Sequence, residues 1–331
     1  MKDINIRNIA IVRLSALGDI VNSAVVLQFI KKFYPDVQVT WITEEIFAPI
    51  LSHIKEIDRV EIINLKKLKK EKSFSLLLSN ISKLKTLDKF DLVIDMQGLL
   101  KSALVSKFLG SKRHGFDKNS TRESLASLFY TTSSAISYKS NVVKRNCFVV
   151  ADALGFEITE SMLLAKKAVF PINKTFIHKS EKKQIAFVIG ASWSSKIYPK
   201  ELVVEVIEQL QEDFHIIWGN EEERLSAEWI CEHSSFATLA PKLTLCELTD
   251  FISSMDLLIG NDTGPTHIAW AQNISSITLL GPTTSRMIYR TPKNIGIKSP
   301  SEVNILKINK NDFSIKEITP EEITTQVKAL L

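Results

Sequence analysis

The sequence predicts an α/β protein built from two doubly wound parallel sheets, and three observations lead to this expectation. Short apolar segments alternate with longer segments whose apolar residues recur at helical spacing. A polar, proline-marked stretch at residues 170–183 interrupts the alternation, and the same pattern then restarts. The chain has 331 residues, which is more than one ordinary core accommodates. We therefore expect two domains, residues 1–170 and 171–331.

The first half contains five candidate strands and five candidate helices. Residues 8–14 are apolar enough for a buried strand, and Pro35 ends the helix that follows them. The expected strands are residues 8–14, 37–43, 59–63, 91–95 and 112–116. The expected helices are residues 19–34, 74–86, 98–109, 121–131 and 139–154.

The second half repeats the alternation after the expected linker at residues 170–183. The expected strands lie near residues 184–190, 214–218, 256–259 and 275–280. The expected helices lie near residues 199–211, 221–233, 244–254 and 263–272, and Pro320 is placed to open a last helix.

Residues 257–270 join a strand to a helix through the polar turn Asn261-Asp262-Thr263-Gly264. The first N–H groups of a helix lack helical partners and carry the positive end of its dipole, so this turn suits an anion such as a phosphate. We expect Asp262 to cap the helix and Gly264 to let a ligand approach the backbone. A well-capped helix without a ligand explains the same pattern.

Asp19 occupies the corresponding place in the first half. It follows the strand at residues 8–14 and so lies on the carboxyl edge of the sheet, where open α/β sheets bind ligands. A single acidic residue at such a turn is also the usual helix cap. The position alone leaves both roles open.

Five motifs together resemble a known family. They are Ser15 to Asp19, Asp91 to Ser102, His114 to Asp117, Thr121 to Ala126, and Asp262 to His267. In this order they are similar to the bacterial lipopolysaccharide heptosyltransferases of glycosyltransferase family nine, and the middle three are most similar to the heptosyltransferase I branch. The resemblance runs from about residue 8 to about residue 285. Heptosyltransferase II, which shares the donor and differs in acceptor, is the main alternative.

The resemblance implies the GT-B architecture, in which two Rossmann-like domains face each other across a cleft. The first domain would bind the acceptor and the second the donor. The last helix, at residues 319–331, usually packs back on the first domain in that architecture. The implied reaction moves heptose from ADP-L-glycero-β-D-manno-heptose to the inner Kdo sugar of Kdo2-lipid A.

The second half contains the residues that the resemblance implies for the donor. In the family, Lys196 and the small residues before it meet the pyrophosphate, Glu221 meets the ribose, and Leu243 lines the adenine. Ala191 departs from the usual threonine, which leaves a backbone contact there. The implied donor-binding residues are Ala191, Ser192, Lys196, Glu221, Leu243, Asp262, Thr263, Gly264 and His267.

Each of these assignments has a simpler reading. A lysine in a loop is usually solvated, and glutamates in a first helical turn favour the helix dipole. His267, four residues after Thr263, shares its helix face and can donate to a phosphate oxygen, but it is equally well explained as a core histidine.

Charge is unevenly distributed: residues 1–170 carry a net charge of +9 and residues 171–331 one of −4. The densest basic cluster, at residues 64–72, is expected to be a solvated loop. By resemblance it meets the acidic sugar and phosphates of the lipid acceptor, and a negatively charged membrane surface would attract the same lysines. The implied acceptor-binding residues are Arg13, Lys66, Lys67, Lys69, Lys70, Gln97, Lys101 and Arg122.

The implied chemistry is a single displacement that inverts the anomeric centre. Asp19 would be the general base for the attacking hydroxyl, while Lys196, Thr263, Gly264 and His267 would stabilise the departing diphosphate. The sequence contains no Asp-x-Asp pair to hold a divalent ion, so we expect a metal-independent reaction.

Other classes of protein fit less well. A dinucleotide-dependent oxidoreductase would need a G-x-G-x-x-G turn, which the sequence lacks, so no cofactor is expected. The lysine cluster has no interleaved aromatic residues, which argues against a nucleic-acid partner. A module that only binds sugar nucleotides would have no need of Asp19.

The start of the chain and the lengths of its apolar runs indicate where in the cell the protein is expected. Polar residues occupy the place of a signal-peptide core, and no apolar run approaches the ~20 residues of a spanning helix. Cys147, Cys231 and Cys246 have no C-x-x-C spacing, so neither disulfides nor a zinc site is indicated. We expect a cytoplasmic protein that is peripheral to the inner membrane.

Overall fold

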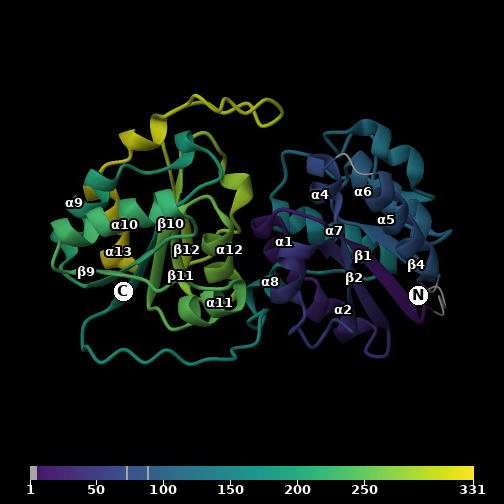
Figure 1. Ribbon diagram of the computed structural model, residues 1–331, viewed down its shortest axis with the longest axis horizontal. Coiled ribbons are helices and arrows are strands. Elements are labelled where there is room, and N and C mark those ends of the chain that lie inside the picture. Colours follow the sequence, from purple (N-terminus) through teal and green to yellow (C-terminus); the bar gives the residue numbers. More distant parts are fainter. Residues whose placement is uncertain (1–5, 72–73, 88) are drawn as a thin grey trace. The chain divides into compact units, whose positions relative to one another are not determined.

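The computed structural model describes residues 6–71, 74–87 and 89–331, without the side chains of residues 66, 69 and 74–78 (Figure 1). The chain divides into two compact units at the bond between Phe170 and Pro171. The division falls at the start of the proline-marked stretch that the sequence analysis takes as a linker. Each unit contains one six-stranded sheet, and all strand pairs in both sheets are parallel.

The first sheet has the strand order β3-β2-β1-β4-β5-β6. Its strands are β1 (Asn8–Val12), β2 (Gln38–Glu44), β3 (Arg59–Ile63), β4 (Leu92–Asp95), β5 (Arg113–Phe116) and β6 (Thr132–Ser134). The helices are α1 (Leu17–Ala24), α2 (Leu27–Phe33), α3 (Ala48–Leu51), α4 (Leu65–Glu71), α5 (Phe74–Thr86), α6 (Leu100–Leu109), α7 (Val142–Leu154) and α8 (Glu160–Leu164). Two 3-10 helices, η1 (Glu45–Phe47) and η2 (Ser124–Phe129), complete the unit.

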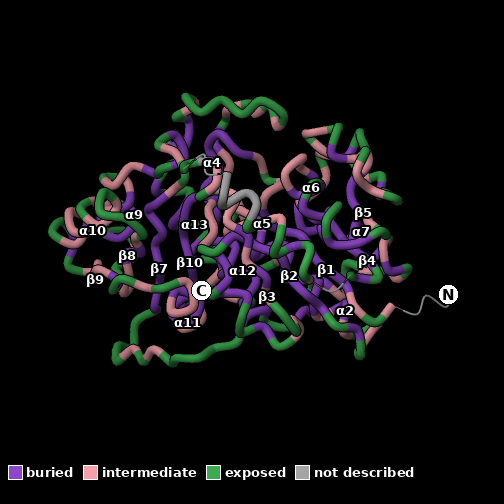
Figure 2. Tube along the Cα trace, turned by 45° about the vertical axis from the view of Figure 1, so that its right-hand side comes forward, coloured by how far each residue is buried: buried purple, intermediate pink, exposed green. Residues whose placement is uncertain are grey.

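Burial of both faces explains the apolar composition of the central strands. Ile9, Ala10, Ile11 and Val12 of β1 are all fully buried, as a strand covered on both sides requires. Residues of α5 and α6 join the core on the face of Ala10 and Val12. The tube in Figure 2 shows the strands buried and the exposed residues mainly in loops and on outer helix surfaces.

The second sheet has the strand order β12-β11-β10-β7-β8-β9. Its strands are β7 (Gln184–Val188), β8 (Asp213–Ile217), β9 (Ala237–Leu239), β10 (Leu257–Asn261), β11 (Ser275–Leu280) and β12 (Asn294–Lys298). The helices are α9 (Lys200–Leu210), α10 (Glu221–His233), α11 (Leu245–Ser253), α12 (Gly264–Ala271) and α13 (Pro320–Leu330). The 3-10 helices are η3 (Ser194–Lys196), η4 (Ser285–Met287) and η5 (Ser314–Glu317). Helices α9, α10 and α13 cover one face, and α11 and α12 cover the other (Figure 1).

The order of strands reverses once in each sheet. In the first sheet the chain proceeds outward from β1 to β3 and then returns to place β4 on the other side of β1. In the second, β7 leads outward to β9, and β10 then pairs with the free side of β7. The loops after β1 and β4, and those after β7 and β10, therefore diverge at the carboxyl edge. Open α/β sheets bind ligands at such switch points.

The structure corrects several expectations about helices. The lysine cluster is not a loop but helix α4, because its Lys, Leu and Glu residues all favour helix. The single helix expected at residues 19–34 is two, α1 and α2, interrupted at the β-branched pair Val25-Val26. Residues 121–131 contain only the 3-10 helix η2.

Short elements were missed altogether. Strands β6 and β9 have three residues each, which is too few for an alternating pattern to be recognised. Strand β12 and helices α3 and α8 were also not expected.

The C-terminal helix belongs to the second unit. Ile323 and Val327 of α13 are buried in the same core as Val203 and Ile207 of α9. Helix α13 is therefore part of the core of the second unit. The Thr319 hydroxyl and the Glu322 carboxylate form a capping box that starts the helix.

Candidate functional site

Asp19 lies in the first turn of α1, at the switch point of the first sheet. Its carboxylate accepts the N–H of Ala16 at 3.4 Å and forms an ion pair with Arg13, with Oδ1 2.9 Å from Nη2. The Asp19 side chain keeps 33% of its surface exposed. It is therefore held in place on one side and open to solvent on the other, which is compatible with both capping and proton transfer.

Arg13 is 7% exposed and ties the loop after β1 to the loop after β4. Its Nη1 donates to the carbonyl of Met96. Gln97 adds a second connection, since its side-chain carbonyl accepts the N–H of Leu14 at 2.9 Å. The expected acceptor residues Arg13 and Gln97 thus both connect the segment before Asp19 to the loop after β4.

The other expected acceptor residues are distributed differently. Lys101 lies in the first turn of α6 and donates to the hydroxyl of Ser15 at 3.2 Å, which places it at the same edge. Arg122 is exposed just before η2. Lys67 and Lys70 are exposed on α4, whereas the side chains of Lys66 and Lys69 lie outside the described residues.

The second unit gathers three ionisable side chains at its own switch point. Lys196, from the loop after β7, donates to the carbonyl of Asp262, and its Nζ is 3.2 Å from Asp262 Oδ2. His267 Nε2 lies 3.2 Å from Asp262 Oδ1. All three residues are 7% exposed or less. The simpler alternative of a solvated loop lysine is therefore excluded for Lys196, because the residue is buried and Asp262 compensates its charge.

Asp262 does not cap α12. The N-cap is Thr263, and the Asp262 side chain instead points to Lys196 and His267. Burial opposes its ionisation, but the hydrogen bond from His267 and the charge of Lys196 outweigh burial and hold the pKa of Asp262 well below its usual range. The carboxylate is thus ionised at neutral pH and neutralises the cation beside it.

Asn261 connects the two loops of this switch point. The fully buried amide donates to the carbonyls of Ile189 and Gly190 at 3.0 and 3.2 Å and accepts the N–H of Tyr198 at 3.2 Å. The loop after β7 is thereby fixed against the end of β10. Thr263 and Gly264 follow directly at the start of α12, which has eight residues.

The remaining expected donor residues lie in loops and at a helix start of the second unit. Ala191 is half-buried and Ser192 is exposed, both in the loop after β7. Glu221 is exposed at the start of α10, where a hydrogen bond from Arg224 holds its pKa below the usual range. Leu243 is half-buried in the loop before α11.

Glu223, which the sequence analysis did not single out, links two of these loops. Its carboxylate accepts the N–H of Gly219 at 2.7 Å and an amide N–H of Asn220 at 2.8 Å. A Cβ at Gly190 would lie 2.4 Å from the carboxyl carbon of Glu223. A larger residue at position 190 would therefore displace the Glu223 carboxylate from this position.

Asn261 and Asp95 were quoted in motifs but given no role. Both residues share one feature: each is the polar last residue of an otherwise apolar, buried strand. Such a residue must be hydrogen-bonded, and at the carboxyl edge its partners are the loops that form the site.

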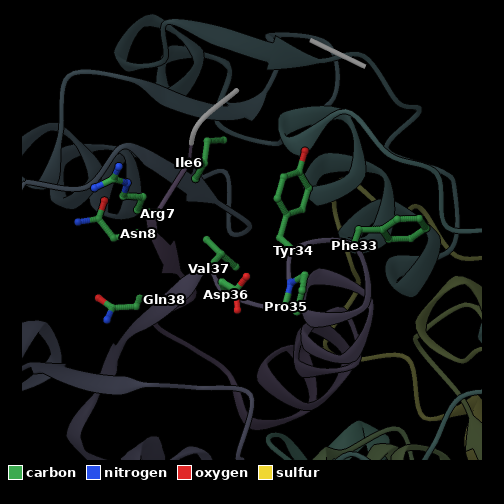
Figure 3. Close-up of a pocket in the computed structure, with 9 residues that line it drawn as sticks. All are labelled: Ile6, Arg7, Asn8, Phe33, Tyr34, Pro35, Asp36, Val37 and Gln38. Atoms are coloured by element: carbon green, nitrogen blue, oxygen red, sulfur yellow. The ribbon is translucent and has the colours of Figure 1, made fainter. Parts of the chain in front are cut away.

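A surface pocket of the first unit lies away from this chemistry (Figure 3). Arg7, Asn8, Tyr34, Asp36 and Gln38 are among its lining residues. Because β1 starts at Asn8 and β2 at Gln38, the pocket lies at the amino edge of the sheet, opposite the loop that carries Asp19. We assign it no role in the reaction.

Within residues 6–71, 74–87 and 89–331, no group of three or more His, Cys, Asp or Glu side chains is arranged to hold a metal ion. In the same part of the chain, none of the helices combines the length and apolar character needed to cross a membrane.

Comparisons with known proteins point to one family. Residues 81–314 match Glycosyltransferase family 9 (heptosyltransferase). The chain is 38% identical to lipopolysaccharide heptosyltransferase 1 of Campylobacter coli, over 97% of this chain and 98% of that protein. It is 25% identical to the protein of the same name from Pseudomonas aeruginosa, over 98% of each. Among solved structures, E. coli heptosyltransferase WaaC with ADP-2-deoxy-2-fluoro heptose has the same fold, with a TM-score of 0.79 at 22% identity over 97% of this chain and 99% of that one.

The buried Asp262 group yields a prediction about stability and pH. Asp262→Asn leaves the Lys196 charge without its counter-charge, so the free energy of unfolding should fall by about 3 kcal/mol at pH 7. A carboxyl group whose pKa is lowered by folding stabilises the folded state at pH values above its unfolded-state pKa of about 4. This stabilisation is lost as the pH falls below that value. The deficit of the variant should therefore shrink in urea unfolding between pH 5 and pH 3.

The exposed Glu232 provides the control for this experiment. Glu232→Gln should change the free energy of unfolding by less than about 0.5 kcal/mol. A deficit of Asp262→Asn that grew on acidification would show that Asp262 is not stabilised in its ionised form.

Proposed function

We propose, from the premise that this chain belongs to glycosyltransferase family 9, the heptosyltransferase family, that it transfers L-glycero-D-manno-heptose from ADP-heptose to the inner Kdo of Kdo2-lipid A. The observation that carries the proposal is the pair of switch points, one with a carboxylate that is one-third exposed and one with the N-terminus of helix α12. The relatives named lipopolysaccharide heptosyltransferase 1 support the acceptor, since they match over nearly their whole length.

The second unit is the proposed donor domain. The first turn of α12 offers N–H groups and the positive end of the helix dipole to the diphosphate, with Thr263 and Gly264 at the point of closest approach. Lys196 and His267 would add cationic or neutral N–H donors from either side of Asp262. Because Asp262 is already paired with both, its charge does not repel the diphosphate as an isolated carboxylate would.

The nucleoside is proposed to lie along the neighbouring loops. The ionised Glu221 would accept hydrogen bonds from ribose hydroxyls, and Leu243 would provide an apolar contact for the adenine. Ala191 and Ser192 would meet the pyrophosphate, Ala191 through its backbone N–H. The solved relative in complex with ADP-2-deoxy-2-fluoro heptose supports a nucleotide-heptose donor for this fold.

The proposed reaction is an inverting single displacement. Asp19 would accept the proton of the attacking hydroxyl while the bond from the anomeric carbon to the diphosphate breaks. The negative charge that develops on the leaving ADP would be stabilised by the α12 terminus and by Lys196 and His267. The helix terminus and these N–H donors would stabilise the diphosphate where a divalent ion otherwise would, so we propose a reaction without metal or cofactor.

The acceptor is proposed to bind to the first unit. Lys101 and Arg122 would meet its carboxylate and phosphate groups, and the basic helix α4 would attract it from a distance. Leu125 and Leu128 of η2 are 59% and 77% exposed beside Arg122. Apolar and basic side chains side by side fit peripheral contact with the cytoplasmic face of an anionic membrane, in which the lipid acceptor resides.

The proposed activity predicts release of ADP from ADP-heptose in the presence of Kdo2-lipid A, with no loss when excess chelator is added. Purified protein, both substrates and a coupled ADP assay suffice for the measurement. Kdo2-lipid A already carrying one heptose provides the comparison acceptor. Reaction with that acceptor alone would instead support heptosyltransferase II, and activity abolished by chelator and restored by magnesium would contradict metal independence.

The proposed base predicts a specific effect of Asp19→Asn. An Asn at this position keeps a side-chain oxygen that can accept the N–H of Ala16, the N-cap residue of α1, but it cannot take a proton at neutral pH. The variant should keep its affinity for ADP-heptose and lower the melting temperature somewhat, because it removes the ion pair with Arg13, while kcat falls by about 10²-fold or more. Asp36→Asn, at an exposed aspartate on the opposite edge of the same sheet, is the matched control and should keep full turnover. Turnover near that of the parent in Asp19→Asn would assign Asp19 to capping alone.

A further inference from the structure

Three separate segments of the first unit meet around one short loop, Met96–Leu99, which joins β4 to α6. They are the end of β4, the strand β5 and the stretch from Thr121 to Tyr130. The Thr121 hydroxyl donates to the carbonyl of Gly98, and the Glu123 carboxylate accepts the N–H of Leu100 at 2.8 Å. The end of the loop that leads into α6 is therefore fixed by two side chains.

Asp95 is the centre of this arrangement. Its side chain is fully buried, and one carboxylate oxygen accepts the N–H groups of Gln97 and Gly98 at 2.8 and 3.1 Å. The other oxygen accepts the hydroxyl of Tyr130 at 2.8 Å. Burial raises the pKa of Asp95, so the fold retains an acidic group where it is costly to ionise. Such a cost calls for a role beyond filling space.

Two glycines show that the arrangement is sterically specified. A Cβ at Gly115 would lie 2.5 Å from the ring of Tyr130, so only glycine at this position of β5 lets the ring pass to Asp95. Gly98 has φ +66°, and a Cβ there would lie 3.0 Å from both Phe116 and the Thr121 hydroxyl. The loop can therefore adopt this conformation, with Tyr130 in contact with Asp95, only because positions 98 and 115 are both glycine.

The loop in turn supports the segment that carries Asp19. The carbonyl of Met96 accepts from Arg13, whose other guanidinium nitrogen pairs with Asp19 at 2.9 Å. Gln97 accepts the N–H of Leu14 at 2.9 Å. A continuous series of contacts therefore runs from Tyr130 through Asp95, the loop and Arg13 to Asp19.

We propose that Asp95 and Tyr130 are positioning residues that hold Asp19 in its reactive orientation through the Met96–Leu99 loop and Arg13. The inference rests on the proposed function of Asp19 as general base. Neither residue touches a substrate in this account. Their effect is on where the carboxylate of Asp19 lies, and a small displacement of a reacting group costs a large part of the rate.

Tyr130→Phe is the decisive variant, because it removes one hydroxyl and keeps the ring. It should lower kcat by about tenfold and leave the KM for ADP-heptose unchanged. Tyr34→Phe is the matched control, since the Tyr34 hydroxyl donates to the carbonyl of Leu154 in the same unit at 2.6 Å. Both variants should lower the melting temperature by a similar amount, but Tyr34→Phe should keep its kcat.

The same substitution in an Asp19→Asn background separates positioning from a general structural effect. If Tyr130 acts through Asp19, adding Tyr130→Phe to Asp19→Asn should change kcat by less than about twofold, because residues that act as a unit are not additive. Asp95→Asn, where it folds, should behave in the same way with a larger loss. An equal loss of kcat from Tyr130→Phe in both backgrounds, or no loss in either, would overturn the positioning role.

The proposed base is tested independently in the same set of proteins. Retained turnover in Asp19→Asn alone would contradict Asp19 as the base, and the positioning role would then be overturned with it. A large loss in Asp19→Asn combined with additive Tyr130→Phe losses would keep the base and overturn the positioning role only.

Discussion

The reversal of strand order at one place in each sheet is the constraint on which the rest of the structure depends. Two loops diverge there, so the strand ends are not covered by a crossover helix. The polar groups at these ends must find partners in neighbouring loops, because buried groups without hydrogen bonds are costly. Asp95 in the first sheet and Asn261 in the second meet this requirement in a similar manner, each as the last residue of a buried strand.

The two switch points differ in charge, and the difference matches the two halves of the proposed reaction. In the first unit, Arg13 and Asp19 form an ion pair whose carboxylate is partly open to solvent. In the second unit, Asp262 is buried between Lys196 and His267, which are held ready beside a helix terminus. A proton acceptor needs access to substrate, whereas groups that stabilise a leaving diphosphate benefit from being fixed in advance.

Much of the fold followed from the sequence because long apolar strands and amphipathic helices carry strong periodic signals. The strands β1, β3 and β11 and the helices α5 and α10 fall within the expected ranges. Elements of three residues, such as β6 and β9, carry no such signal and depend on pairing with a neighbouring strand. Helix α4 was expected to be a loop because its dense lysines indicate a solvated segment, although its residues favour helix.

The candidate site was predictable in its location but less so in its contacts. Turn chemistry alone placed Asp19, Lys196 and Asp262 at the carboxyl edges of the sheets. It could not show that Asp262 turns away from the helix cap towards Lys196, since this depends on residues 66 positions apart along the chain. The contacts of Asp95 with Tyr130 are likewise long-range, and they require a glycine on an intervening strand.

The central claim, that each switch point has its own substrate, is tested most directly by hydrogen exchange with and without ADP-heptose. The account predicts slower exchange in residues 190–198 and 261–267 of the second unit, with little change in residues 13–19 and 96–101 of the first. Adding Kdo2-lipid A should then slow exchange in the first unit. Protection by ADP-heptose confined to residues 13–19 and 96–101 would contradict the assignment of the donor to the second unit.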